Sequence, residues 1–320
     1  MSTLITSDIK REDAALESPT QRAVAVTFDD LPAVSVTRQD IAHYREITNK
    51  LLSIITANKI PAIGFVNEEK LYREGKWYWK SRLDDARVAL LQQWIDSGLE
   101  LGNHSFSHPD LNTTPLDSYK ADVIRGETVT SKLLRRKAMR LRYFRYPFLR
   151  TGTNLETRRH FEEFLAVRGY RVAPGTVDSA DWIFAAAYAK AGERDNKKML
   201  RRVATAYVPF VEAEFAYAEK QSAALFGYEI KQVLMLHANE LNADHLGVLA
   251  DMMKRRGYSF ISLDEALTDK AYALPDTYTG PRGISWLHRW AWTARKPDAF
   301  FAGEPVPPAF VMEEAGVTLG

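Results

Sequence analysis

The chain has 320 residues, 46% of them hydrophobic and 26% charged, which is typical of a folded globular protein with one large core or two smaller ones. Its 43 basic and 41 acidic residues give a formal net charge of +2, too balanced to indicate nucleic acid or an anionic membrane as the main partner. The sequence contains no cysteine, which excludes disulfides, thiolate metal ligands and a cysteine nucleophile. Any metal ion must therefore be held by His and carboxylate side chains.

The first 22 residues are polar and are expected to form an N-terminal extension. They lack the basic, apolar and small-residue sections of a signal peptide, and no later run is long and apolar enough to span a bilayer. We therefore expect a soluble protein. It would be periplasmic or secreted if a signal peptide has been removed, and cytoplasmic otherwise. Nothing in the sequence indicates the oligomeric state.

From residue 23 onward, short apolar or β-branched runs alternate with longer segments of helical period. This alternation predicts an α/β fold with a parallel sheet or barrel. The expected strands are 23–28, 62–66, 99–103, 142–147, 169–173, 232–237 and 258–262, and the expected helices are about 40–57, 84–97, 116–137, 155–167 and 243–256.

Two further stretches differ in composition from this pattern. The segment at about 183–232 is rich in Ala, Lys, Glu, Tyr and Leu at helical spacing, which predicts a helical insertion. Residues 269–320 are rich in proline and aromatic residues and poor in regular period. We expect this segment to be an irregular tail packed on a catalytic domain at 23–268, with its Trp286, Trp290 and Trp292 serving mainly as packing residues.

The stretch VAVTFDDLP, residues 24–32, is an apolar run that ends in the adjacent carboxylates Asp29 and Asp30. Neighbouring carboxylates repel each other, so a fold keeps them together only where a metal, an arginine or solvent compensates. Other polar residues also stand at or just past the end of a predicted strand. The C-terminal ends of parallel strands converge at one edge of the sheet, where active sites are built. The residues at these ends are Asp29, Asp30, Asn103, His104, Arg145, Asp178, Asp181 and His237.

A second informative stretch is GNHSFSHPDL, residues 102–111, in which His104 and His108 are four residues apart. Two histidines at that spacing can share one metal ion, although the pair alone is a weak signal. Two imidazoles together with one carboxylate form a set suited to a catalytic divalent metal with open positions. One acid of the doublet would then bind the metal, which offsets the repulsion, while its neighbour stays free as a base.

Five ordered stretches resemble the motifs of the polysaccharide deacetylases, the NodB-homology carbohydrate esterases. They are TFDD at 27–30, NHSFSH at 103–108, RYPF at 145–148, DSADW at 178–182 and LMLH at 234–237. The resemblance implies a distorted (β/α) barrel of about seven strands. It also implies a metal-dependent hydrolase that removes acetyl groups from N-acetylated or O-acetylated sugars.

Carried over residue by residue, the resemblance makes Asp30, His104 and His108 the ligands of a divalent metal, Zn²⁺ first, with Co²⁺ or Mn²⁺ as alternatives. It makes Asp29 the general base, tethered and kept ionised by Arg145.

The same resemblance makes His237 the general acid, oriented by Asp181 rather than Asp178, because Asp181 precedes Trp182. Trp182, Met235 and Leu236 would line the pocket for the acetyl methyl group, and a backbone N–H near Phe148 would hold the oxyanion. Asn242 is expected to be the N-cap of the helix that follows.

The sequence departs from the common family pattern at Leu31, where glycine is usual, at Phe148, where tyrosine is frequent, and at Ala238 and Asn239. None of these positions is a proposed ligand, base or acid, but they alter the walls of the site. The expected substrate is an N-acetylated poly- or oligosaccharide of the chitin, peptidoglycan or exopolysaccharide type. The alternatives are an acetyl ester hydrolase on xylan, a hydrolase of a small non-sugar amide, and an inactive sugar-binding module.

Overall fold

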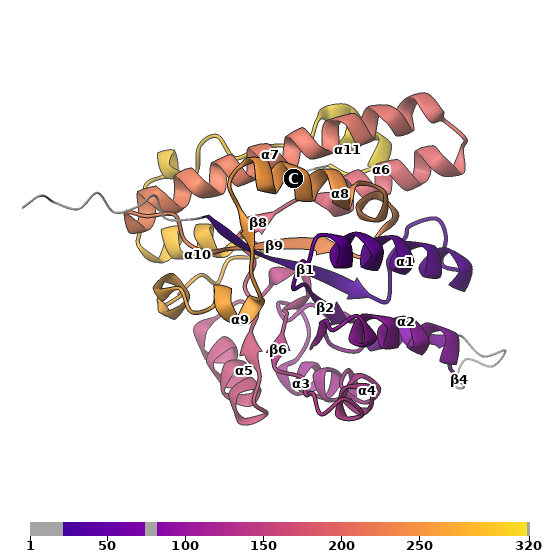
Figure 1. The fold of residues 1–320 in the computed structure, drawn as a ribbon. Helices are drawn as coiled ribbons and strands as arrows, with labels where there is room; N and C mark the ends of the chain where they lie inside the picture. Colours follow the sequence, from indigo (N-terminus) through magenta and orange to yellow (C-terminus); the bar gives the residue numbers. More distant parts are fainter. Residues whose placement is uncertain (1–21, 74–81, 319–320) are drawn as a thin grey trace, which may run out of the picture.

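The computed structural model describes residues 22–73 and 82–318, so the expected extension lies outside the described residues except for Arg22. The described chain forms a curved, eight-stranded sheet in which every paired strand is parallel, with helices packed around it (Figure 1). The order is β7-β6-β5-β2-β1-β9-β8, with β10 also paired to β1. This is the distorted (β/α) barrel that the sequence predicted.

All seven expected strands are present, and one strand of the eight-stranded sheet and the separate two-stranded pair were not predicted. The missed strand, β8, pairs with β9 through only Val177 and Asp178, which is too short for a periodic pattern to reveal. The strands of the sheet are β1 (Ala23–Leu31), β2 (Ile63–Val66), β5 (Glu100–Asn103), β6 (Tyr143–Phe144), β7 (Arg171–Val172), β8 (Val177–Asp178), β9 (Gln232–His237) and β10 (Ser259–Phe260), and the short strands β3 (Tyr72–Arg73) and β4 (Arg82–Leu83) form a separate pair.

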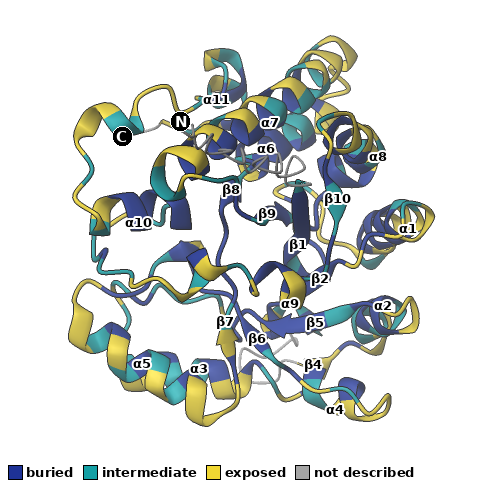
Figure 2. Cartoon of the chain, turned by 60° about the vertical axis from the view of Figure 1, so that its left-hand side comes forward, coloured by how far each residue is buried: buried dark blue, intermediate teal, exposed yellow. Residues whose placement is uncertain are grey.

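Strand β1 is central to the sheet and buried along almost its whole length. It pairs with β9 on one side, and on the other with β10 at its start and β2 toward its end. Because strand residues alternate between faces, Val24, Val26 and Phe28 join the large core beneath the helices. Ala23 and Ala25 join a smaller cluster with Phe65 inside the barrel, and Figure 2 shows these buried strands within a ring of helices with exposed outer sides.

The helices lie near the predicted ranges, but the segment predicted at 116–137 is two helices, separated at Gly126. A side chain at Gly126 would lie 2.4 Å from the backbone carbon of Ser105, so this close approach requires glycine. The helices are α1 (Ile41–Ala57), α2 (Asp85–Asp96), α3 (Leu116–Arg125), α4 (Thr130–Arg135), α5 (Leu155–Val167), α6 (Asp181–Glu193), α7 (Lys197–Phe226), α8 (Glu240–Arg255), α9 (Leu263–Ala266), α10 (Trp286–Thr293) and α11 (Ala309–Ala315), with 3-10 turns η1 (Glu68–Leu71), η2 (Pro147–Leu149), η3 (Lys270–Ala273) and η4 (Asp298–Phe301).

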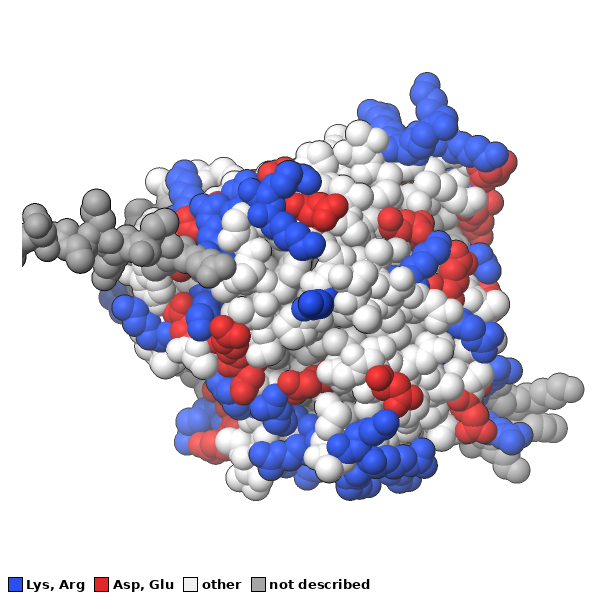
Figure 3. Space-filling view, viewed as in Figure 1, with Lys and Arg blue, Asp and Glu red and all other residues white. Residues whose placement is uncertain are grey.

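The predicted insertion consists mainly of α6 and α7, and the tail is more regular than expected because it contains α10 and α11. Trp286 and Trp290 are buried, as expected of packing residues, whereas Trp292 is half exposed. The division into a catalytic part at 23–268 and a tail stays a prediction. Among the described residues, no helix combines the length and apolarity needed to cross a membrane. On the face drawn in Figure 3, basic and acidic side chains are interspersed around a large uncharged area.

Candidate metal centre and proton-transfer groups

A bulge at the end of β1 allows the two adjacent aspartates to serve different neighbours. Phe28 pairs with Gly64 and Leu31 with Val66, so β1 uses one more residue than β2 across this interval. Asp30 takes a left-handed backbone conformation with φ of 69°. The bulge interrupts the strict alternation of a strand, and Asp29 stays in register with His237 of β9 while Asp30 turns toward the loop after β5.

Asp30, His104 and His108 come together as a candidate metal centre. One ligand atom from each lies within 4.8 Å of the others, and no other group of three such residues does so in the described part of the chain. The Asp30 Oδ1 atom is 3.7 Å from His108 Nε2 and 3.9 Å from His104 Nε2. This oxygen is buried and has no hydrogen-bond partner. A carboxylate and two imidazoles that converge on an unsatisfied oxygen fit a divalent cation.

The two histidines of this centre are in the form that binds metals. His104 Nδ1 lies 2.8 Å from the Arg145 carbonyl, which can only accept, so Nδ1 carries the proton and Nε2 presents its lone pair. Burial is the main cause that lowers the pKa of His104 to about 4. Burial, assisted by the neighbouring His104, likewise lowers the pKa of His108 to about 4. Both rings are therefore neutral near neutral pH.

The loop that carries these histidines is fixed by neighbouring elements. Asp122 of α3 accepts hydrogen bonds from the backbone N–H groups of Phe106 and Ser107, and from the Ser107 hydroxyl. Asn103 Oδ1 accepts from the Ser105 N–H at 2.7 Å. Gly126 allows α3 and its connection to α4 to approach Ser105 closely. The loop is thus held in place by contacts on several sides.

Asp29 is the second carboxylate of the doublet and is only 2% exposed. Arg145 Nη1 lies 3.4 Å from Asp29 Oδ2, and Arg145 Nη2 donates to the Thr27 hydroxyl at 3.0 Å. Arg145 thus contacts Asp29, as expected of a tether, and favours its ionised form, but it is not the largest influence on this carboxyl. Burial is the larger influence and raises the pKa of Asp29, although Arg145 and His237 act in the opposite direction. Asp29 is therefore a stronger base than an ordinary aspartate.

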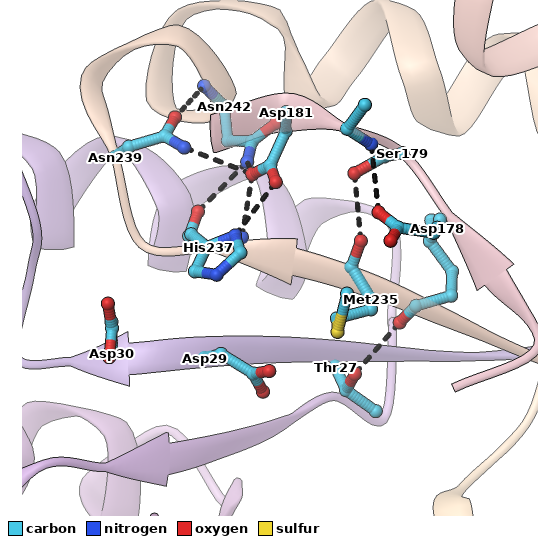
Figure 4. A network of polar contacts seen from close by, with 12 residues as sticks. Thr27, Asp29, Asp30, Asp178, Ser179, Asp181, Met235, His237, Asn239 and Asn242 are labelled. Carbon is cyan, nitrogen blue, oxygen red and sulfur yellow. Dashed lines mark hydrogen bonds and ion pairs between the residues drawn. The ribbon is translucent and has the colours of Figure 1, made fainter. Parts of the chain in front are cut away.

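His237 and Asp181 form a closely hydrogen-bonded pair in which Asp181 is buried and the His237 side chain is 18% exposed (Figure 4). His237 Nδ1 donates to Asp181 Oδ1 at 2.8 Å, and the His237 backbone N–H donates to Asp181 Oδ2 at 2.7 Å. Burial alone would lower the pKa of His237, but the charge and hydrogen bond of Asp181 outweigh it and raise the pKa to about 10. His237 is therefore an imidazolium near neutral pH, with Nε2 on the side away from Asp181.

Two asparagines hold Asp181, a role that sequence analysis predicted for neither of them. Asn239 Nδ2 donates to Asp181 Oδ2 at 3.0 Å, and Asn242 Nδ2 makes a short hydrogen bond to the same oxygen. The expectation that Asn242 caps the following helix is wrong. The cap of α8 is Asn239, whose side chain accepts from the Asn242 N–H, because the helix begins three residues earlier than predicted, at Glu240.

Of the four expected pocket residues, Phe148, Trp182 and Met235 lie on the side of the site, and Leu236 does not. Phe148 and Trp182 are 52% and 47% exposed, and the Phe148 ring packs edge-on against His108 with centroids 4.4 Å apart. Met235 lies on the same face of β9 as His237. The expectation for Leu236 is wrong. It is fully buried, lies beside Phe28 in the register with β1, and alternation turns it toward the helix layer.

Lys70 is the residue at the site that sequence analysis missed entirely. Its Nζ is 3.2 Å from Asp30 Oδ2. No motif marks it, since it belongs to the 3-10 turn η1 after β2 and comes near Asp30 only through the fold. The available signal was its position just past a predicted strand, which it shares with the other site residues.

Residues 17–163 match the family model described as polysaccharide deacetylase. The matched segment contains Asp29, Asp30, His104, His108 and Arg145. Over this segment, which is 147 of the 320 residues, the chain is similar to the polysaccharide deacetylases. Asp181 and His237 lie beyond the matched segment, so their assignment rests on the other two motifs and on the geometry above.

Solved structures similar to this chain include a CE4 family pseudoenzyme, a peptidoglycan deacetylase and a family 4 carbohydrate esterase. A mutant of a CE4 family pseudoenzyme from Bacillus anthracis has 15% sequence identity and a TM-score of 0.51, with 78% of this chain and 68% of that chain covered. The peptidoglycan deacetylase PdaC from Bacillus subtilis has 20% identity, a TM-score of 0.47, and coverage of 78% and 94%. A family 4 carbohydrate esterase from Streptomyces lividans, in complex with acetate, has 18% identity, a TM-score of 0.45, and coverage of 77% and 95%. The similarity to the pseudoenzyme mutant, at a TM-score of 0.51 and 15% identity, is a similarity of fold alone.

Proposed function

We propose that this chain is a metal-dependent hydrolase that removes acetyl groups from N-acetylated sugars of a polysaccharide or oligosaccharide. The observation that carries this proposal is the coexistence, at one edge of the sheet, of a carboxylate–imidazole ligand set and two proton-transfer groups, the carboxylate Asp29 and the imidazolium His237, whose pKa values are both raised. The match to the polysaccharide deacetylase model supports an acetylated carbohydrate as the substrate class.

In this proposal Asp30, His104 and His108 hold the divalent cation. The favoured ion is Zn²⁺, with Co²⁺ and Mn²⁺ as alternatives. When bound, the cation would supply Lewis acidity that polarises the acetyl carbonyl and lowers the pKa of water to about 7. The neutral imidazoles and the unsatisfied Asp30 Oδ1 support this assignment.

Asp29 acts as the general base. It takes a proton from the attacking water while the water oxygen forms a bond to the acetyl carbon. Its raised pKa favours that proton transfer, and Arg145 fixes the orientation of the carboxylate through its own bond to Thr27. The backbone N–H of Phe148 donates to the developing oxyanion.

His237 acts as the general acid. When the bond between the acetyl carbon and the sugar nitrogen breaks, His237 Nε2 donates its proton to the departing amine, and the products are acetate and a free amino sugar. Asp181 holds Nδ1 and keeps the ring charged, so the proton is available at neutral pH. The exposed rings of Phe148 and Trp182, with Met235, flank the acetyl group and the sugar.

The test is acetate release from chitooligosaccharides, peptidoglycan and acetylated xylan by protein stripped with a chelator and then resupplied with single metals. The proposal predicts release from one of the N-acetylated substrates that disappears on stripping and returns with Zn²⁺. Release from xylan alone would instead identify an ester hydrolase. Absence of release from every substrate, with metal bound, would contradict the proposal and favour a non-sugar amide or an inactive relative like the pseudoenzyme.

A further inference from the structure

Lys70 places a positive charge directly on the candidate metal centre. Its Nζ is 3.2 Å from Asp30 Oδ2, and it also donates to the Asp30 backbone carbonyl at 3.3 Å. The side chain is only 22% exposed. The lysine therefore contacts both the carboxylate and the backbone of one proposed metal ligand.

The turn that carries Lys70 is braced against both neighbouring segments of the site. Asn67 donates through its N–H to the Leu31 carbonyl and through Nδ2 to the Phe106 carbonyl. The Glu69 N–H also donates to the Phe106 carbonyl at 3.0 Å. Arg87 Nη1 donates to the Lys70 carbonyl at 2.8 Å. These contacts fix η1 between the end of β1 and the histidine loop, so the ammonium is part of the built site.

The lysine divides the two oxygens of Asp30 between two tasks. Oδ2 is paired with Lys70, whereas Oδ1 faces His104 and His108 and has no hydrogen-bond partner. Only Oδ1 is therefore free to bind a cation. Each aspartate of the doublet also has its own cationic partner, because Arg145 is paired with Asp29 and Lys70 with Asp30. The sequence interpretation gave Asp29 the partner Arg145 and left the repulsion to be offset by the metal, whereas the structure adds Lys70 as a cation for Asp30.

We propose that Lys70 is a positioning residue that restricts Asp30 to one-oxygen ligation, stabilises the ligand cluster without metal, and weakens its affinity for divalent cations. This inference rests on the proposed metal site. A fixed ammonium repels a dication bound to the same carboxylate, and in a partly buried site that repulsion is only weakly screened. Burial tends to raise the pKa of Asp30, but Lys70 is the largest of the influences that lower it below its usual range.

The experiment measures Zn²⁺ affinity, by competition with a chromophoric chelator, and the thermal unfolding midpoint of the stripped protein. The variants are Lys70→Met, which removes the charge, and Lys70→Arg, which keeps it. Lys50→Met is the matched control, because Lys50 is also paired with acidic residues, Glu46 and Asp244, outside the site. We expect Lys70→Met to bind Zn²⁺ at least tenfold more tightly and to unfold at a lower temperature when stripped. Lys70→Arg and Lys50→Met should keep the wild-type affinity.

Equal or weaker Zn²⁺ binding by Lys70→Met, with a wild-type near-ultraviolet circular dichroism spectrum, would overturn this inference. Lys70→Gln, which keeps a polar side chain, provides a second uncharged variant if Lys70→Met fails to fold, and the same outcomes apply to it. If the Asp30→Asn variant bound Zn²⁺ as tightly as the wild-type protein does, the proposed metal site itself would be overturned. The two failures are therefore distinguishable.

Discussion

His104 is buried and His237 is only partly exposed at the same edge of the sheet, and each makes a 2.8 Å hydrogen bond through Nδ1, yet their pKa values differ widely. His104 donates to a neutral carbonyl, so burial dominates and its pKa falls to about 4. His237 donates to the Asp181 carboxylate, which overrides burial and raises its pKa to about 10. The partner of Nδ1 thus decides whether a buried imidazole is a neutral ligand or a cationic acid.

The largest expected effect separates the base from the metal ligands. Asp29→Asn removes the base but leaves Asp30, His104 and His108 in place, so turnover should fall by about 10²–10⁴-fold while the metal content stays at the wild-type value. His104→Ala should lose both metal and turnover. Acetate release and metal analysis of the purified variants measure the two effects. Near-normal turnover by Asp29→Asn would contradict the assignment of the base.

The next largest effect is expected when Asp181, the hydrogen-bond partner that distinguishes His237 from His104, loses its charge. Asp181→Asn removes the strongest influence that opposes burial and leaves only the charges of Asp30 and Asp29, so the pKa of His237 should drop well below about 10. The general acid must be protonated, so the alkaline limb of the profile of kcat against pH should move to lower pH by more than one unit. Circular dichroism controls for folding. An alkaline limb in the wild-type position would show that Asp181 does not tune the acid.

A smaller effect is expected from a substitution that disturbs the loop of His104 and leaves His237 unchanged. A methyl group at Gly126 would meet the Ser105 backbone carbon at 2.4 Å and the Phe106 nitrogen at 2.6 Å. Gly126→Ala should displace the histidine loop at a cost of about 1–3 kcal/mol and weaken Zn²⁺ binding by roughly tenfold or more. Chelator competition measures this loss, and the alkaline limb that reports on His237 should not move. Unchanged affinity would show that the loop can shift without cost.

The smallest effect leaves both histidines untouched. A methyl group at Gly283, in the tail, would lie 1.7 Å from the Phe148 carbonyl oxygen. Gly283→Ala should therefore displace the Phe148 segment and lower kcat/KM by up to about tenfold, with the Zn²⁺ affinity unchanged. Gly303→Ala in the same tail is a control, because its Cβ would meet no atom within 4 Å, although its positive φ adds local strain. Equal activity of Gly283→Ala and wild type would mean that the tail does not support this segment.

The sequence was informative where chemistry requires particular residues in a short stretch. The strand alternation predicted a parallel sheet or barrel, and the aspartate doublet with the histidine pair predicted a metal site at its edge, because both depend on local pattern. The family resemblance then indicated that Asp30 joins His104 and His108, which the structure brings together. Lys70 and Asn242 could not be assigned in this way, since their contacts join segments that lie far apart along the chain. The sign of the shift at Asp29 also depends on burial, which no motif records.

The division of roles between His104 and His237 is tested most directly by the nitrogen-15 chemical shifts of their ring nitrogens in chelator-stripped protein at about pH 7.5, with the signals assigned through the His104→Ala and His237→Ala variants. The geometry predicts that both nitrogens of His237 are protonated, and that His104 is neutral with its proton on Nδ1. A neutral His237 at this pH, or a His104 protonated on Nε2, would contradict the assignment of one as acid and the other as metal ligand.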